Sequence, residues 1–407
     1  MKKKPEKLHM ANKKASIIVL AVAALIFAAA VFLIYSQDYL NGIEEHFMAH
    51  AGGFLEFERG TVLEILSEEL KPDEGAEGHL RGNQKLSVVI RSGRYKGEIM
   101  TANNFFGAII GVPLEVGDSV IFTVKTHDDG SHIATVYEFD RLPTLAVCLV
   151  LFFAVIFLVG GRTGVKSLIG LIFTAACLFV ILIPLLIKGA PTVLTTFLVC
   201  AYIAVVSFTV LGGVHRKTVS AFLGTMAGVL LALLFALAAQ HFAKIDGYRL
   251  DTAEELLQMR YYESPLRIRG LLAAGVIISA LGAVMDVAMS ISSSLEEVHA
   301  ANPAMTGREL FRSGMNIGHD MAGTMTNTLI LAFLGCEFSF IIFFYAQGLT
   351  FRRLVTTPFV GIEAISSLAS SVGMILAIPL TALIASVLIA GKDRKGKNGV
   401  RKKKAKR

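Results

Sequence analysis

The chain has 407 residues, of which 54% are hydrophobic and only 17% are charged, and its mean hydropathy is +0.62. Soluble globular proteins average about 25% charged residues, so this composition argues against a water-soluble monomer and predicts a membrane protein. The net charge of +7 could suggest a nucleic-acid partner, but 16 of the 39 Lys and Arg lie in the first 14 and last 16 residues. We therefore expect no binding of nucleic acid.

Eight segments have the roughly 20 apolar residues that a helix needs to cross a hydrocarbon core of ~30 Å. They are residues 15–35, 142–160, 167–187, 192–212, 218–242, 270–293, 322–347 and 361–390. The first follows six lysines, and no A-x-A cleavage site comes after it, so we interpret it as an uncleaved signal anchor; a cleaved signal peptide is the alternative.

The distribution of basic residues predicts the orientation of these spans. Basic residues are concentrated in the tails and in alternate loops, which favours a multi-pass membrane protein with both termini inside. The expected order is a basic tail (1–14), the signal anchor (15–35), an extracytoplasmic domain (36–141), a seven-helix membrane domain (142–390) and a polybasic tail (391–407). Anionic lipid headgroups are the expected partner of that last tail.

The extracytoplasmic domain contains short alternating apolar runs instead of helical periodicity. Candidate strands are residues 57–65, 86–91, 95–101, 119–125 and 132–139, with turn signals at Ser92-Gly93 and at Asp128-Asp129-Gly130. Five such strands predict a small β-barrel of the OB or SH3-like kind. The acidic, glycine-rich stretch 71–83 is expected to be a mobile loop. Phe105 and Phe106 could stack on a ligand, although filling the barrel or resting on the membrane is the favoured reading.

Four carboxylates within or beside the last three spans are the leading functional candidates: Asp286, Asp320, Glu337 and Glu363. An acid costs ~2.5–3.5 kcal/mol near the bilayer centre, so it normally faces other helices or water and marks a pathway. The alternative for Asp320 and Glu363 is that each caps a helix N-terminus or meets headgroup water.

Three of the four acids, all except Glu337, lie on polar helical stripes. The stripes are Gly282, Asp286, Ser290 and Ser294; Asp320, Thr324 and Asn327, with Thr328 next to it; and Glu363, Ser367, Ser370 and Ser371. Gly314, Gly318 and Ala322 form a small-residue row that would allow close helix packing. The three stripes could line one hydrophilic track, although Asn327 could equally make an interhelical hydrogen bond.

Two strings carry a family resemblance: ALGAVMDVAMSISSSL at 280–295 and NIGHDMAGTMTNTLILAF at 316–333. With the extracytoplasmic β-domain and the following spans, they resemble the YibE/F-like family of bacterial multi-pass membrane proteins. The resemblance covers residues 57–390 and implies an architecture more than an activity. It implies importance for Asp286, Asp320, Thr324, Asn327 and Thr328, which lie inside the strings. His319 departs from the family pattern, in which arginine is common.

The sequence contains no HExxH, GxSxG or Walker A motif, and its four cysteines lie in apolar runs without metal-ligand spacing. We therefore expect neither an enzyme nor a metal or other cofactor. The favoured hypothesis is a transporter or permease for an ion or small solute. The alternative is a non-transporting envelope scaffold whose outer β-domain binds a partner or polymer, and a third reading assigns a partner to an external helix at 251–262. The sequence does not indicate an oligomeric state.

Overall fold

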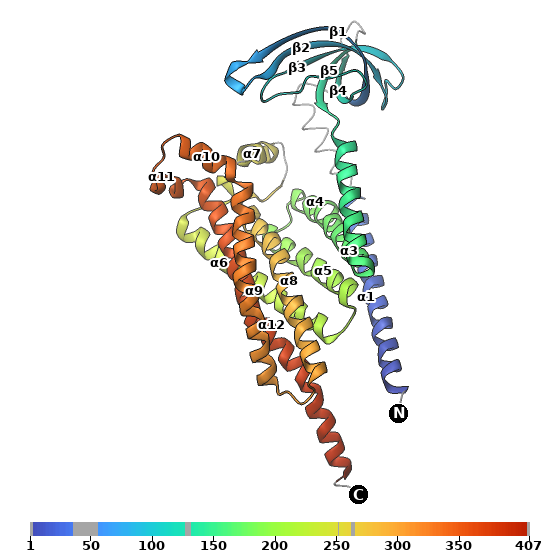
Figure 1. Ribbon diagram of the computed structural model, residues 1–407, viewed down its shortest axis with the longest axis vertical. Coiled ribbons are helices and arrows are strands. Elements are labelled where there is room, and N and C mark those ends of the chain that lie inside the picture. Colours follow the sequence, from blue (N-terminus) through green and yellow to red (C-terminus); the bar gives the residue numbers. More distant parts are fainter. Residues whose placement is uncertain (1–2, 36–55, 127–131, 251, 262–264, 405–407) are drawn as a thin grey trace. The chain divides into compact units, whose positions relative to one another are not determined.

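The computed structural model describes residues 3–35, 56–126, 132–250, 252–261 and 265–404 (Figure 1). The chain divides into two compact units, Met1–Ile43 with Gly160–Arg407, and Glu44–Val159. The expected turn at Asp128-Asp129-Gly130 and the last three residues of the expected polybasic tail lie outside the described residues.

The smaller unit contains a five-stranded barrel. Its strands are β1 (Glu56–Asp73), β2 (His79–Ile90), β3 (Ile99–Phe106), β4 (Ser119–Thr126) and β5 (His132–Phe139). They form a closed barrel in the order β1-β2-β3-β5-β4, with β3 and β5 parallel and the other neighbours antiparallel. The predicted small barrel is confirmed, and its strand order is that of the OB kind.

Alternation of side chains explains the barrel core. On β3, Met100, Ala102, Asn104 and Phe106 are buried while the residues between them are exposed or half-buried. Phe106 is 6% exposed and fills the barrel, whereas Phe105 is 60% exposed on its outer surface. The expectation that both phenylalanines share one role is therefore wrong, because neighbouring residues of a strand point to opposite faces.

Two barrel predictions need correction. The expected mobile loop at 71–83 is mostly strand, because β1 and β2 pair as far as Asp73 and His79 and close through a 3₁₀ turn at Glu74–Ala76. This ribbon has no apolar face, so hydropathy could not reveal it. The third strand begins at Ile99 instead of residue 95, because Gly97 N–H donates to Ile90 O and Glu98 N–H donates to Tyr95 O in a turn that precedes it.

The buried Asp140 joins the barrel to the helix that follows. One carboxylate oxygen accepts from Ser119 Oγ at 3.2 Å and pairs with Arg59 Nε at 3.0 Å. The other accepts from the backbone N–H of Leu142 at 3.1 Å, in the first residue of α3 (Leu142–Ala176). Strands β1 and β4 are thereby tied to the start of an apolar helix.

The other unit is helical. Its elements, besides the second part of α3, are α1 (Lys3–Tyr35), the π-helical turn η2 (Cys177–Leu182), α4 (Ile183–Ile187), α5 (Thr192–Gly212), α6 (Arg216–Ala243), the 3₁₀ turns η3 (Gly247–Arg249) and η4 (Ile268–Gly270), α7 (Ala253–Tyr261), α8 (Leu271–Ala301), α9 (Gly307–Cys336), α10 (Phe338–Ala346), α11 (Phe351–Thr356) and α12 (Pro358–Lys404). Among the described residues, six helices are long and apolar enough to cross a membrane, or seven if the bent pair α9 and α10 is one span.

The difference from the eight expected spans lies in α3 and the elements after it. The second and third expected spans form one apolar run of 46 residues, Leu142–Ile187, with a non-helical break at Gly161. At ~1.5 Å per residue such a run is about 69 Å long, more than twice a hydrocarbon core of ~30 Å. The run is therefore long enough for two crossings in total, one before the break and one after it.

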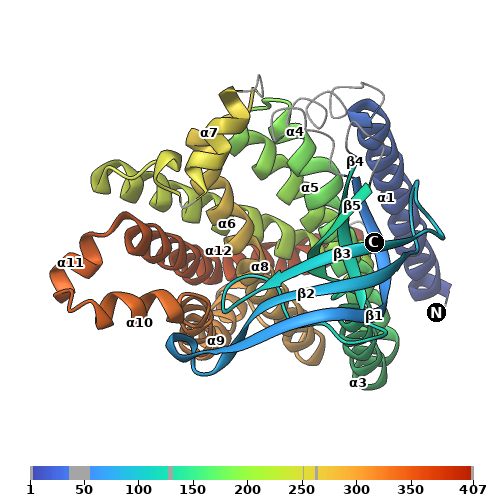
Figure 2. The ribbon, with the colours of Figure 1, turned by 90° about the horizontal axis from the view of Figure 1, so that it is seen from above.

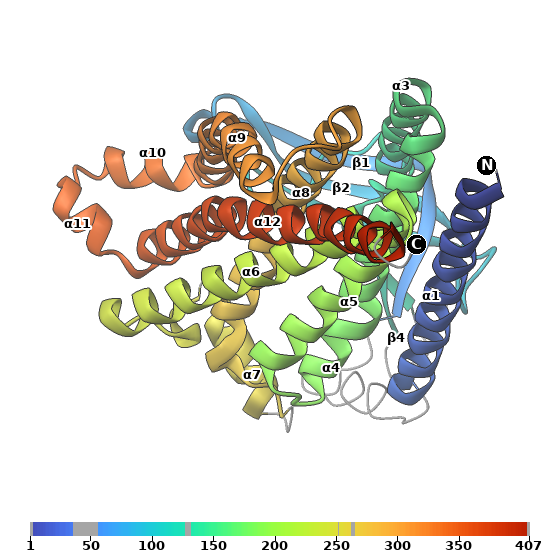
Figure 3. The same ribbon diagram turned by 90° about the horizontal axis from the view of Figure 1, so that it is seen from below.

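Helices α6, α8 and α12 pack closely at the centre of the helical unit. A Cβ on Gly228 of α6 would lie 2.7 Å from Ala377 Cβ of α12 and 2.8 Å from Val284 Cγ1 of α8. The view from below places α12 beside α6, with α8 and α9 across from α6 (Figure 3). Small residues have this role in membrane bundles because, without a hydrophobic force between helices, close van der Waals contact drives their association.

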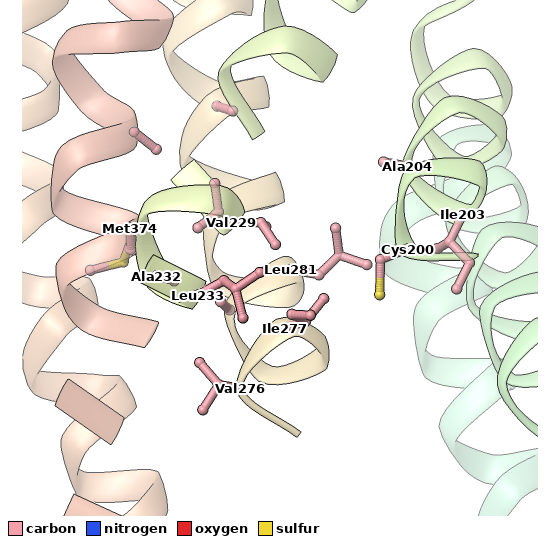
Figure 4. Packing of buried hydrophobic residues seen from close by; sticks show 14 of the residues in the cluster. Cys200, Ile203, Ala204, Val229, Ala232, Leu233, Val276, Ile277, Leu281 and Met374 are labelled. Carbon is pink, nitrogen blue, oxygen red and sulfur yellow. The ribbon is translucent and has the colours of Figure 1, made fainter. Parts of the chain in front are cut away.

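Helix α5 completes the core. Cys200 lies on the side of α5 toward Ile277 and Leu281 of α8, and these three residues and Ile203 of α5 belong to one buried apolar cluster (Figure 4). Polar groups inside the bundle pair across helices: Ser279 and Ser370 hydroxyls lie 2.8 Å apart, joining α8 to α12. These contacts fix the helices that carry the candidate site.

Candidate carboxylate site at a helix break

A sharp break interrupts the expected seventh span at Glu337. Helix α9 ends at Cys336 and α10 begins at Phe338, and the two helices meet at an angle of 60°. Glu337 has φ −96° and ψ 10°, its N–H donates to Phe333 O, and its own carbonyl accepts from Ile341 N–H. Glu337 is both the C-cap of α9 and the N-cap of α10. It therefore lies at the corner where the two helices meet.

Glu337 and Glu363 are both among the residues that line one pocket. The pocket has a volume of about 290 Å³ and lies between the corner of α9 and α10 and the first turns of α12. Both acids are half-buried. Apart from Ser367, the other lining residues are apolar: Ile330, Phe333, Leu334, Phe340, Ile341, Phe359, Val360, Ala364 and Leu368.

Aromatic rings form part of the pocket wall. The Phe340 and Phe359 rings have centroids 4.4 Å apart and are tilted by 43°. Helices α10 and α11 extend away from the bundle before the chain returns into α12 (Figures 2 and 3). Phe340 lies in α10 and Phe359 in the first turn of α12. The geometry therefore combines two carboxylates with an otherwise apolar, aromatic lining, which favours a bound cation or proton over an anion.

Asp286 is not among the residues that line this pocket. It is exposed on α8, as is Gly282 one turn away, and a Cβ on Gly282 would meet no atom within 4 Å. The buried residues of α8, such as Val284 and Val287, point to the opposite side into the core. The structure thus brings Glu337 and Glu363 together and leaves Asp286 on another face of the bundle.

The polar stripe of α9 is also exposed. Asp320, Thr324, Asn327 and Thr328 all have exposed side chains. The threonine hydroxyls bond to their own helix: Thr324 Oγ1 donates to Met321 O at 3.1 Å, and Thr328 Oγ1 donates to Thr324 O at 2.9 Å. These hydrogen bonds satisfy the hydroxyls locally, so they need no partner on another helix.

The alternative in which Asp320 and Glu363 cap helices is wrong. Helix α9 begins at Gly307, so Asp320 lies several turns inside it, and α12 begins at Pro358, five residues before Glu363. The N-cap of α9 is Thr306, whose hydroxyl accepts from Glu309 N–H while the Glu309 carboxylate accepts from Thr306 N–H at 2.7 Å. Glu309 and Thr306 thus form a capping box.

The small-residue row of α9 lies where that helix meets α8 and α12. A Cβ on Gly314 would be 2.9 Å from Ala382 Cβ, and one on Gly318 would be 2.1 Å from Ile378 Cγ2. Ala322, the third member of the row, is half-buried. Close packing at Gly314 and Gly318 holds the lower part of α9 against the bundle and so positions the break at its other end.

Sequence reasoning missed the pocket and its aromatic lining. The mean hydropathy of a window of about 20 residues stays high across Glu337, because a single acid among phenylalanines changes the mean very little. Mean hydropathy therefore does not indicate the bend. The available signal was Glu337 itself, an acid inside an otherwise uninterrupted apolar run, followed by Phe338, Phe340 and Phe343.

Comparison with known proteins gives one match. A scan against protein-family models matches residues 148–391, which covers α5 to α9 and the pocket, to the family described as YibE/F-like protein. The barrel lies before the matched residues. Searches of curated proteins and of solved structures found no match. Because the family match covers more than half of the chain, this protein belongs to the YibE/F-like family.

Proposed function

We propose that this YibE/F-like protein is a membrane permease for a small cation or cationic solute, which binds between Glu337 and Glu363. The observation that carries the proposal is the placement of both carboxylates in one pocket at a break between helices. We propose no enzymatic step, because the sequence contains none of the catalytic motifs named above.

The broken helix supports this function. Discontinuous helices in transporters expose helix ends to the substrate, and the C-terminal ends of half-helices attract cations. Glu337 is the C-cap of α9, so the partial negative charge of that helix end adds to the carboxylate charge. A cation at the corner would therefore meet two sources of negative potential at once.

The lining indicates the chemical class of the solute. Phe333, Phe340 and Phe359 present aromatic surface, which attracts organic cations through the ring quadrupole. A Ca²⁺ ion needs about six to eight oxygen ligands. The described residues contain no cluster of three or more His, Cys, Asp or Glu that could hold a metal ion. An amine or quaternary ammonium ion with an apolar body fits better, and a proton is the second possibility.

Flux through reconstituted protein tests the proposal. Purified full-length protein would be placed in liposomes, and uptake of labelled tetraethylammonium and of protons would be followed for wild type, Glu337→Gln and Glu363→Gln. We expect wild-type uptake of one of these ions above empty liposomes, and a loss of at least about tenfold in each pocket variant, since each removes a charge that stabilises the bound cation.

Two other variants make this test specific. Glu255→Gln removes an exposed acid on α7, outside the pocket, and Asp286→Asn removes the acid on the outer face of α8. Both should transport like wild type. Wild-type flux in Glu337→Gln and Glu363→Gln would contradict the proposal, and a loss confined to Asp286→Asn would move the path to the face of α8.

The alternative function is an envelope scaffold that acts through the barrel. The supporting observation is a set of exposed apolar side chains on the barrel, with Phe105, Ile109 and Ile110 exposed by 60%, 96% and 71%. This hypothesis predicts that cross-linked full-length protein captures a reproducible envelope partner, and that Ile109→Ser with Ile110→Ser abolishes the capture. Reproducible capture without flux above empty liposomes would favour the scaffold.

We also propose the orientation that the charge distribution predicts, with both termini inside the bacterial plasma membrane and the barrel outside. Anionic lipid headgroups are the proposed partner of the polybasic C-terminal tail. Labelling of single cysteines in intact cells with an impermeant reagent tests this. Lys96→Cys in the barrel should react, whereas a cysteine at Arg407 should react only after lysis.

A further inference from the structure

An apolar groove separates α5 from α6 on a different part of the helical unit from the carboxylate pocket. Its volume is about 620 Å³. Leu194 and Phe197 of α5 and Leu230, Leu233 and Leu237 of α6 line it. Leu194, Leu230 and Leu237 remain 58%, 45% and 42% exposed, so no segment among the described residues covers these leucines.

Two arginines lie at one end of the groove. Arg267 and Arg269 both line it, and they flank the fully buried Ile268 in the turn η4 that leads into α8. Both are exposed, and within the part of the chain that the structure describes neither takes part in a salt bridge. Their charges are therefore available to a ligand.

The turn that carries the arginines is held in place. Thr192 Oγ1, at the start of α5, donates to Arg267 O at 2.9 Å. A Cβ on Gly247 would lie 2.1 Å from Ile268 O, so η3 packs directly on the same turn. The burial of Ile268 fixes the residues on either side of it. The turn that carries both arginines is thus held where α5 begins and just before α8, at one end of two helices long and apolar enough to cross a membrane.

We propose that this groove binds an anionic phospholipid, with one acyl chain between α5 and α6 and the phosphate at Arg267 and Arg269. A groove open to hydrocarbon must contain chains, because an empty apolar groove would leave its lining without van der Waals partners. Basic sites between membrane helices select anionic headgroups, each arginine favouring them by about fivefold. The combination of apolar walls and a charged end matches a phospholipid better than a free anion, which would leave the walls unfilled.

The sequence offers a direct probe, because the chain contains no Trp. Leu194→Trp places one fluorophore in the groove of the full-length protein. In phosphatidylcholine bilayers that contain an equal fraction of brominated phosphatidylglycerol or brominated phosphatidylcholine, quenching reports which lipid occupies the groove. Leu376→Trp on α12, 40% exposed and outside the groove, is the reference position.

We expect phosphatidylglycerol to be preferred at Leu194→Trp by about fivefold or more, and near equality at Leu376→Trp. Adding Arg267→Gln and Arg269→Gln should bring the preference at Leu194→Trp close to one. Arg352→Gln with Arg353→Gln is the matched control, because it removes two exposed arginines of α11 that do not line the groove. That pair should leave the preference unchanged.

Three results would overturn the proposal. The first is equal quenching by both lipids at Leu194→Trp, and the second is a preference that survives the loss of Arg267 and Arg269. The third is displacement of the preference by inorganic phosphate in the buffer, which would identify a site for a soluble anion. The groove shares no residue with the carboxylate pocket, so absence of cation flux would leave this inference standing.

Discussion

Gly228 offers the sharpest test of the helical packing. It lies where α6 meets α8 and α12, and a Cβ there would stand 2.7 Å from Ala377 Cβ, 2.8 Å from Val284 Cγ1 and 3.0 Å from Gly373 O. Rotation of neighbouring side chains cannot relieve all three contacts, because the Gly373 oxygen belongs to the backbone. Gly228→Ala should therefore force α6 away from its neighbours.

The expected magnitude follows from two opposing effects. Inserting a methyl group into a packed core costs about 1–3 kcal/mol, whereas replacing Gly by Ala inside a helix gains about 0.8–1.0 kcal/mol. Because a Cβ at Gly228 would make three contacts at 3.0 Å or less, the cost should lie at the upper end of that range, and the net loss should be about 2 kcal/mol. At Gly275 of α8, where a Cβ would meet nothing within 4 Å, the same substitution should only gain.

Thermal stability in detergent, measured by the fraction that elutes as monodisperse protein after heating, checks both variants. A change of 1 kcal/mol shifts the midpoint by about 2–4 °C for domains of 150–250 residues. Gly228→Ala should fall by several degrees and Gly275→Ala should stay level or rise. A rise in Gly228→Ala equal to that in Gly275→Ala would show that the three helices are not this close.

Three further predictions concern the barrel and the start of α9. Asp140→Ala should destabilise the barrel by about 1–3 kcal/mol through loss of the hydrogen bonds described above, and faster hydrogen exchange in β1 and β4 checks it. Gly93→Ala should destabilise it comparably, because φ is +63° and a Cβ would lie 1.8 Å from Glu58 Oε1; an unchanged melting curve would refute the clash. Hydrogen bonds from the Thr306 backbone N–H and hydroxyl lower the pKa of Glu309, in the charged stretch before the apolar part of α9. A carboxyl group whose pKa is lower in the folded state than in the unfolded state, where it is about 4.3, stabilises the fold while it is ionised, and this stabilisation is lost as the pH falls. The difference in free energy of unfolding between wild type and Thr306→Val should therefore shrink below about pH 4. A constant difference would contradict the assignment.

Local patterns predicted much of the barrel. Residues 132–139 were expected as a strand with the bounds that β5 has, because short apolar runs alternate there and a turn signal precedes them in the sequence. The far end of the β1–β2 ribbon, at residues 71–83, was missed because backbone hydrogen bonds hold it there without an apolar face. The start of β3 was displaced because Gly97, at φ +94°, belongs to a turn and not to the strand.

The helical unit shows the same division between local and tertiary information. Apolar length located the spans, and the boundary expected after residue 160 coincides with the break at Gly161, but apolar length could not show that α9 breaks at Glu337. The stripe of Asp286 was identified from spacing, yet spacing cannot tell which face of a helix meets its neighbours. Glu337 and Glu363 are 26 positions apart, and the return of α10 and α11 brings them together.

The central claim is that a cation occupies the pocket between Glu337 and Glu363. Hydrophobic carbodiimides modify carboxyl groups in apolar surroundings, and mass spectrometry of the digested protein locates the modified residue. We predict modification at Glu337 or Glu363 that tetraethylammonium suppresses, with exposed Glu255 showing no such protection. Modification of the pocket glutamates that stays the same at every concentration of tetraethylammonium and at every pH would contradict the account.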